Sequence, residues 1–215
     1  MAEQELLDVF DDNMTLIGKA SRQDVHKKGL WHQSIHCWIV RQIGRQQYVL
    51  FQRRGPEKKV YPNTLDITAA GHLIAGETAR DGVRELNEEL GLSARFEELI
   101  PLGIRCDVAI IGDVTNREFC HVYLFDCGLE LDAYRLQADE VSGLVQMEIR
   151  DCMQLFSMEK KLAHVDGYQV GADGAKRAIS LDVSRDDVIP RLDGYYMKVC
   201  IMAERYFQGN RYLSV

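Results

Sequence analysis

The sequence has no stretch that approaches the roughly 20 consecutive apolar residues needed for a membrane-spanning helix. Its first segment, MAEQELLDVFDDN, is acidic, and it lacks the basic flank and apolar run of a secretory signal. Internal repeats and low-complexity segments are also missing. Because 46% of the residues are hydrophobic and 27% are charged, the composition is that of an ordinary folded domain. We therefore expect a soluble, cytoplasmic protein without membrane attachment.

The chain also lacks an excess of positive charge, since its formal net charge is -7 at pH 7. Polymeric nucleic acids are held by clustered Lys and Arg, so no general nucleic-acid-binding surface is expected. A small anion could still bind in a single basic pocket. Six cysteines are present without a C-x-x-C pair, and we interpret them as reduced core residues rather than disulfides or zinc ligands.

The length of 215 residues fits one domain with a small extension. A hairpin is predicted where the β-forming runs 34–43 and 47–54 flank the Gly44 turn. Other predicted strands are the runs ELLDVFD and TLIGKA near the amino terminus and residues 65–68, 98–105, 118–125 and 143–149, and predicted helices are 79–90, 151–163 and 186–207. We assign 1–30 to an amino-terminal β extension, 31–160 to the main domain and 161–215 to a helical extension packed on it.

The segment GHLIAGETARDGVRELNEELGL, residues 71–92, carries the most chemical information. Thr78 is the expected N-cap of its helix, and Gly91 is expected to end it. Residues three and four apart share a helix face, so the carboxylates of Glu85, Glu88 and Glu89 are predicted to converge. Such a cluster suits Mg²⁺ or Mn²⁺, which also bind phosphates, although a solvated acidic helix face would give the same three glutamates.

This segment resembles the Nudix box: Gly, five residues, Glu, seven residues, Arg-Glu, an aliphatic residue, any residue, Glu-Glu, any residue, Gly, aliphatic. The matching positions are Gly71, Glu77, Arg84, Glu85, Leu86, Glu88, Glu89, Gly91 and Leu92. Only six residues, 78–83, separate Glu77 from Arg84 where the pattern has seven. The missing residue falls at the start of the helix and leaves the later glutamates in register.

The Nudix resemblance implies an α/β (α+β) fold in which a mixed β-sheet lies between helices as an α/β/α sandwich. It also implies hydrolysis of a diphosphate linkage in a small molecule, with Mg²⁺ (or Mn²⁺) held by Glu85, Glu88, Glu89 and the Gly71 carbonyl. Glu77 is expected to pair with Arg84 and support the metal-binding loop. Our candidate general base is Glu88, and Glu140 is a weaker candidate.

A second resemblance, to isopentenyl-diphosphate isomerase of the same superfold, covers about the first two thirds of the chain. It is carried by His26 and His32 around Gly-Leu-Trp, by the run QRRGPEKKVYPNTLDITAAGH at 52–72, and by Asn116-Arg117-Glu118. It implies a metal role for His26, His32, His72 and Glu118, and diphosphate binding by Arg54 and Lys58. On residue type alone, these histidines could instead be structural, and the two basic residues could belong to a solvated loop.

Isomerase chemistry is not expected, because Ala70 occupies the position of the catalytic cysteine and a methyl group supplies neither acid nor base. The isomerase also lacks the full glutamate cluster that this chain carries. We therefore predict a Nudix hydrolase acting on a nucleoside diphosphate-X or related small molecule. The alternatives are an isomerase with a displaced catalytic residue and a catalytically silent ligand-binding module. The helical tail after Asp151 is expected to close the pocket or to form a homodimer interface.

Overall fold

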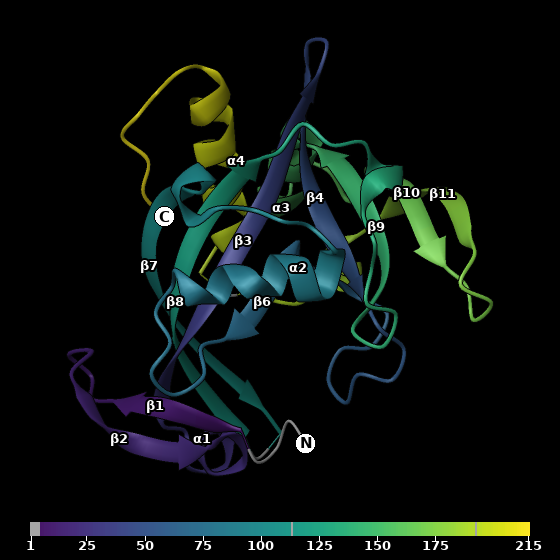
Figure 1. The fold of residues 1–215 in the computed structure, drawn as a ribbon. Coiled ribbons are helices and arrows are strands. Elements are labelled where there is room, and N and C mark those ends of the chain that lie inside the picture. The colour runs from purple at the N-terminus through teal and green to yellow at the C-terminus, as the bar shows by residue number, and fades with distance from the viewer. Residues whose placement is uncertain (1–4, 113, 192) are drawn as a thin grey trace.

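The computed structural model describes residues 5–112, 114–191 and 193–215 (Figure 1). Within them, eleven strands form one mixed sheet in the order β11-β10-β9-β4-β3-β1-β2, with β5 on β4, β6 and β8 on β3, and β7 on β8. The strands are β1 (Leu6–Phe10), β2 (Leu16–Ser21), β3 (Trp31–Ile43), β4 (Gln46–Arg54), β5 (Leu65–Ile67), β6 (Ala69–His72), β7 (Ile100–Ile111), β8 (Val114–Asp126), β9 (Val141–Glu148), β10 (Ala163–Val170) and β11 (Lys176–Val183). The helices are α1 (Arg22–Lys28), α2 (Arg84–Leu90), α3 (Ile149–Phe156) and α4 (Tyr195–Phe207). No helix of the described residues is long and apolar enough to span a bilayer.

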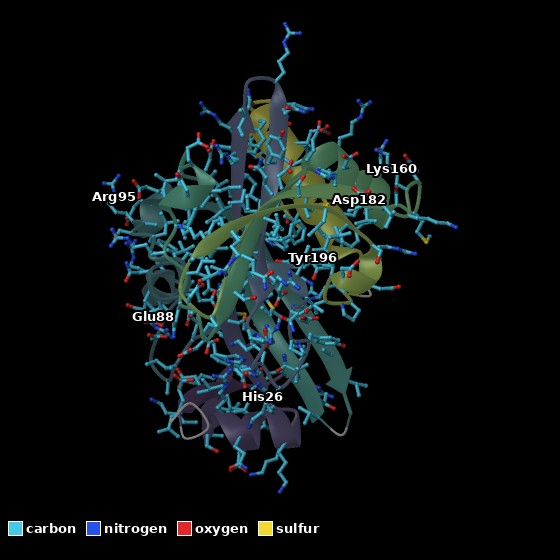
Figure 2. The ribbon with its side chains drawn as sticks, turned by 90° about the vertical axis from the view of Figure 1, so that its right-hand side faces the viewer. His26, Glu88, Arg95, Lys160, Asp182 and Tyr196 are labelled. Carbon is cyan, nitrogen blue, oxygen red and sulfur yellow. The ribbon has the colours of Figure 1, made fainter. Side chains whose placement is uncertain are left out.

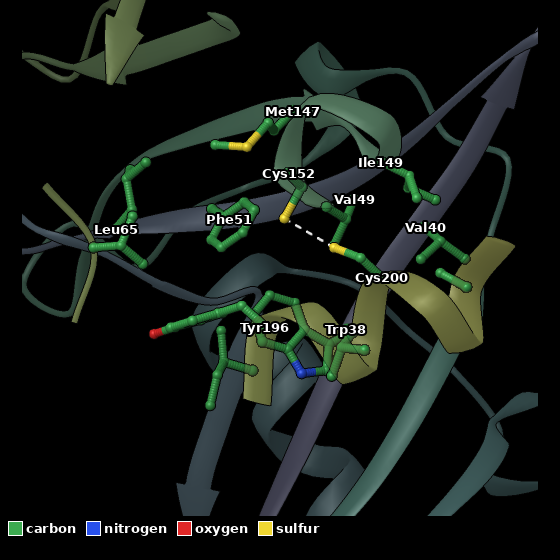
Figure 3. Close-up of a cluster of buried hydrophobic side chains, with 14 of the residues drawn as sticks. Trp38, Val40, Val49, Phe51, Leu65, Met147, Ile149, Cys152, Tyr196 and Cys200 are labelled. Carbon is green, nitrogen blue, oxygen red and sulfur yellow. Dashed lines mark hydrogen bonds between the residues drawn. The ribbon is translucent and has the colours of Figure 1, made fainter. Parts of the chain in front are cut away.

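Strand β3 organises two hydrophobic cores on opposite faces of the sheet. Its side chains alternate, so Trp38 and Val40 face one core while Ile35, Cys37 and Ile39 face the other. The first core includes residues of α3 and α4, and the second includes residues of α2. Figure 3 shows the first core. The α/β/α arrangement predicted from the sequence is thereby confirmed.

The predicted central hairpin is present: β3 and β4 pair antiparallel around Gly44, whose φ of 61° is the left-handed conformation that glycine adopts readily. The other predicted strands also form, with ends shifted by a few residues. Cys37, Cys120, Cys152 and Cys200 are buried free cysteines, as predicted for core residues. Cys106 is exposed, so the core interpretation is wrong for that residue.

The amino-terminal extension contains a helix that was not predicted. Ser21 caps α1 by accepting a hydrogen bond from the Asp24 amide at 3.2 Å, and Gly29 ends the helix with a φ of 61°. Both are ordinary helix-end signals, and the short length of α1 hid them between two strands. This helix carries His26, one of the predicted site residues.

The prediction that residues 161–215 are helical is wrong for the first part of that segment. Strands β10 and β11 form an antiparallel hairpin, and β10 extends the sheet by pairing with β9. The helix predicted at 186–207 begins only at Tyr195, because Pro190 cannot donate a helical hydrogen bond and Gly194 is left-handed. The tail therefore enlarges the sheet and also covers one face with α4.

Candidate functional site

The loop before α2 brings the glutamates of that helix against strand β6. Leu86 and Leu90 are buried beneath α2, which holds the helix on the sheet. A Cβ atom on Gly71 of β6 would overlap the carboxyl group of Glu85, so any other residue at this position would displace that carboxylate. The helix is shorter than predicted: residues Asp81–Val83 form a 3₁₀ turn, and the α-helix begins at Arg84. Its predicted end at Gly91 is confirmed by a φ of 65°.

Arg84 connects three glutamates of this region. Its guanidinium binds both carboxylate oxygens of Glu77, at 2.9 and 3.1 Å. It also lies 2.6 Å from Glu85 Oε1 and 3.0 Å from Glu88 Oε2. The expected Glu77–Arg84 pair thus forms despite the shorter spacing, because the tight 3₁₀ turn accommodates the six residues between them. Glu77 also accepts a hydrogen bond from the Ile74 amide at 2.9 Å and so supports the loop.

Glu89 points away from this pair into the protein, where its Oε2 accepts a hydrogen bond from the Ala70 amide at 3.2 Å. Burial, together with the nearby negative charge of Glu85, raises the pKa of Glu89 to about 8. Burial likewise raises the pKa of Glu85. Glu88 is half exposed, and Figure 2 shows it at the edge of the molecule. Helix α2 therefore places Glu85 and Glu89 in a buried environment and Glu88 in a solvent-exposed one.

The predicted convergence of the three glutamates is looser than expected. Among the described residues, two groups of potential metal ligands have all their ligand atoms within 4.8 Å of one another, and neither group includes Glu85, Glu88 or Glu89. Arg84 supplies one positive charge against the three glutamates Glu77, Glu85 and Glu88, so the region stays negative. An all-oxygen donor set with excess negative charge fits a hard divalent cation. The contact over Gly71 also fits such a cation, because the Gly71 backbone lies directly against the Glu85 carboxylate.

One of these two groups of potential metal ligands consists of His26, His32 and His72. Their ring centroids lie 4.9 to 5.3 Å apart. His32 Nδ1 lies 3.1 Å from the Leu30 carbonyl, which makes this nitrogen the donor and leaves the buried Nε2 lone pair without a hydrogen-bond partner. Burial lowers the pKa of His26 and of His32 to about 4, so both imidazoles are neutral at pH 7, as a metal ligand requires.

Glu118 of β8 lies beside these histidines, 3.3 Å from His72 Nε2 and 3.7 Å from His32 Nε2. Ser34 and Asn116 donate hydrogen bonds to its two oxygens at 2.8 and 2.6 Å. Burial alone would raise the pKa of Glu118, but the hydrogen bond and charge of His72 hold it well below the usual range. The four predicted residues His26, His32, His72 and Glu118 are thus brought together.

His36 lies on the other side of Glu118, with its Nε2 3.9 Å from Glu118 Oε2, and with Glu118 and Cys120 it forms the second group of potential metal ligands. Its Nδ1 lies 3.0 Å from the hydroxyl of Tyr195, which also accepts a hydrogen bond from Trp38 Nε1 at 3.0 Å. Burial lowers the pKa of His36 to about 3, so it is a neutral core residue. His121 is partly buried, and its Nε2 has no hydrogen-bond partner among the described residues.

The basic residues near the site are already engaged. Arg54 donates to the carbonyls of Tyr61 and Val60 and to Asp66, at 3.1 to 3.2 Å, so it holds its own loop in place. Lys58 forms an ion pair with Glu140, the weaker candidate for general base. Burial, with the nearby charge of Arg54, lowers the pKa of Lys58.

A further cation, Arg22, was not among the candidates from the sequence. It lies at the start of α1, and its charge lowers the pKa of Lys58 and of both His26 and His32. The signal that could have revealed it is the unpredicted helix, because a residue four positions before His26 shares its helix face. Arg22 also forms a 3.5 Å ion pair with Glu5.

Comparison with known proteins identifies the family. A model of the NUDIX domain matches residues 30–167. The chain belongs to the Nudix family. An uncharacterized Nudix hydrolase of Clostridium acetobutylicum is 42% identical over 194 residues, which are 90% of this chain and 94% of that protein. A crystal structure of a Deinococcus radiodurans protein matches the fold with a TM-score of 0.54 and 19% identity, over 73% of this chain and 91% of that one.

Nudix hydrolases typically cleave pyrophosphate bonds and generally use divalent metal ions, and this chain is accordingly a Nudix pyrophosphohydrolase. The isomerase resemblance is also confirmed. An isopentenyl-diphosphate Delta-isomerase of Paenarthrobacter aurescens is 31% identical over 126 residues, covering 58% of this chain and 67% of that protein. The segment of this chain that matches the Nudix box is Gly71–Leu92, and its first glycine, Gly71, lies beneath Glu85.

Proposed function

We propose that this Nudix protein hydrolyses the diphosphate linkage of a nucleoside diphosphate-X or related small molecule with Mg²⁺ or Mn²⁺. Glu85, Glu88, Glu89 and the Gly71 carbonyl would hold the ion. The observation that carries the proposal is the close approach of the Glu85 carboxylate to the Gly71 backbone, which leaves no room for a Cβ atom between them. Glu89, fixed by the Ala70 amide, stands on the buried side of the same backbone.

Each residue has a defined part in this proposal. When bound, a divalent cation neutralises the diphosphate oxygens and makes water more acidic. Glu88 takes the proton of the attacking water, because it is the glutamate of α2 that solvent reaches most readily. Arg84 keeps Glu85 and Glu88 oriented through its contacts with both. Lys58 holds the diphosphate after exchanging its partner Glu140, while Arg54 shapes the loop and adds positive charge.

The isomerase alternative is disfavoured by Ala70, which contributes only a methyl group beside β3. The silent binding module is disfavoured by the intact set of four box glutamates and their arginine. An assay for interconversion of isopentenyl and dimethylallyl diphosphates tests the first alternative. The hydrolysis assay described next tests the second.

The decisive experiment compares wild type with Glu88→Gln on nucleotides, dinucleotides, sugar nucleotides and isoprenoid diphosphates, with and without Mg²⁺. We expect metal-dependent release of phosphate-containing products on one class, and a fall in kcat of roughly 100-fold or more in the variant, the usual size of a lost general base. Glu159→Gln is the matched control, because Glu159 is an exposed glutamate beyond the end of α3. Equal activity in both variants, or none in wild type, would contradict the proposal.

We also propose that His26, His32, His72 and Glu118 bind a second metal ion. Neutral imidazoles and one carboxylate suit a transition metal such as Mn²⁺ or Zn²⁺ better than Mg²⁺. We expect purified wild type to take up one more equivalent of such a metal than His32→Ala, as measured by elemental analysis after dialysis. His164→Ala is the control, since His164 is an exposed histidine of β10. Identical metal content in all three proteins would exclude the second ion.

A further inference from the structure

Strand β7 has a long open edge. Among the described residues it pairs only with β8, so the backbone groups on its other side face outward. Figure 1 shows β7 on the outside of the sheet, with the C-terminus beside it. The tail protects only the start of this edge, where the Val215 amide donates to the Leu102 carbonyl at 3.0 Å. The register irregularity of the strand also falls there, between Pro101 and Gly103. From Ile104 onward the pairing of β7 with β8 is regular, and no other strand of the described residues pairs with β7.

The side chains along this edge are apolar on the exposed face. Ile104, Val108 and Ile110 are 47%, 53% and 76% exposed, and Cys106 between them is exposed too. Natural edge strands are usually guarded by lysine, proline or bulges, which prevent pairing with another chain. Residues 104–110 contain no lysine, proline or bulge, and their two charged side chains point to the buried face. Such an edge is suited to pairing.

We infer that this edge joins two copies of the chain into a dimer, with β7 antiparallel to β7 of the second copy and Cys106 at the twofold axis. An antiparallel register centred on Cys106 places Ile104 opposite Val108, and Arg105 opposite Asp107, in both directions. Opposite charges across strands stabilise a pair, and like charges destabilise it. A shift of the centre to either neighbour would put Arg105 against Arg105 or Asp107 against Asp107. The charge pattern therefore favours this register over its two neighbours, and the resulting pairing is self-complementary, as an interface between two identical copies requires.

The buried face gives this register a second support. Arg105 uses Nε and Nη2 to bind Asp193 and Asp107 at 2.7 Å. Its Nη1 is buried and has no hydrogen-bond partner among the described residues. A buried unpaired donor of this kind is costly. The second copy's Asp107 would stand across the strand from Arg105, and each carboxylate oxygen can accept more than one hydrogen bond. Dimerisation thus adds a second carboxylate beside the buried Arg105 side chain.

The oligomeric state tests the inference directly. Light scattering after size exclusion is expected to give twice the monomer mass of 24.6 kDa at micromolar concentration. Val108→Lys should yield a monomer with an unchanged circular dichroism spectrum, because a lysine on the edge blocks pairing. Ile17→Lys is the control, since Ile17 is 64% exposed on β2 and should remain dimeric. A monomeric wild type, or a dimer that Val108→Lys leaves intact, would overturn the inference.

The register is tested on the unaltered protein. Oxidation with copper phenanthroline should cross-link two wild-type chains through Cys106, giving a dimer on a non-reducing gel. Cys106→Ser should stay dimeric in solution yet lose the cross-link, while Cys127→Ser, a half-buried cysteine, should keep it. A wild-type dimer that does not cross-link, or that cross-links equally in Cys106→Ser, would overturn the proposed register.

Discussion

Gly71→Ala is expected to lower kcat about 100-fold or more while the protein stays folded, because a misplacement of about 1 Å at a catalytic centre can cost that much. The added Cβ would overlap the carboxyl group of Glu85. What must move is the end of a flexible side chain, so the free energy of unfolding should fall by only about 1–3 kcal/mol. The measurement is steady-state hydrolysis of the substrate found in the panel, together with urea unfolding.

The control for this variant is Gly18→Ala on β2. A Cβ at Gly18 would meet no atom within 4 Å, so both activity and stability should stay near those of wild type. Full activity in Gly71→Ala would remove the Glu85 contact from the proposed mechanism. Failure to fold would show instead that the backbone of β6 cannot tolerate the substitution, and Glu85→Gln would then test the carboxylate without touching the glycine.

The sequence allowed the central sheet to be predicted because its signals are local. The alternation along β3 and β4 and the turn at Gly44 lie within a short segment, and a hairpin needs nothing else. The pattern at 71–92 likewise specified a helix that ends at Gly91. The hairpin of β10 and β11 was missed because its apolar residues alternate irregularly, and its strand character depends on pairing with β9. Strand β9 lies outside the 161–215 segment, so the local pattern of that segment could not reveal the pairing.

The site residues also differ in how far local sequence signals could predict their contacts. Glu77 and Arg84 could be paired from the box alone, because they lie only seven positions apart along one loop and helix. The histidine cluster joins α1, β3 and β6 with Glu118 of β8, and a resemblance to a known family suggested it before any distance was known. The separation of Glu89 from Glu88 was not foreseen, because helix spacing gives the face of a residue but not how deeply the face is buried. Arg22 was missed with its helix.

Arg191→Met is expected to lower the free energy of unfolding by about 3 kcal/mol, because breaking a buried ion pair leaves a charge uncompensated in the interior. Arg191 forms ion pairs with Asp107 of β7 and, at 3.6 Å, with Asp66 of β5. Both aspartates are buried, and burial alone would lower the pKa of Arg191, whereas Asp66 and Asp107 hold it well above the usual range. Each aspartate retains one arginine, Arg54 or Arg105, which places the expected loss at the lower end of such effects.

Arg177→Met is the matched control for this substitution. Arg177 forms a 2.6 Å ion pair with Asp173, but the two side chains are 59% and 56% exposed, so its loss should cost about 0–1 kcal/mol. Urea unfolding of both variants and wild type at pH 7 compares the two costs directly. An equal, small effect in both would mean that water reaches Asp66 and Asp107 when Arg191 is removed. A large effect at Arg191 alone would show that residues after α3 hold together the strands that carry Asp66 and Asp107, so the carboxyl-terminal segment is part of the domain that supports the site.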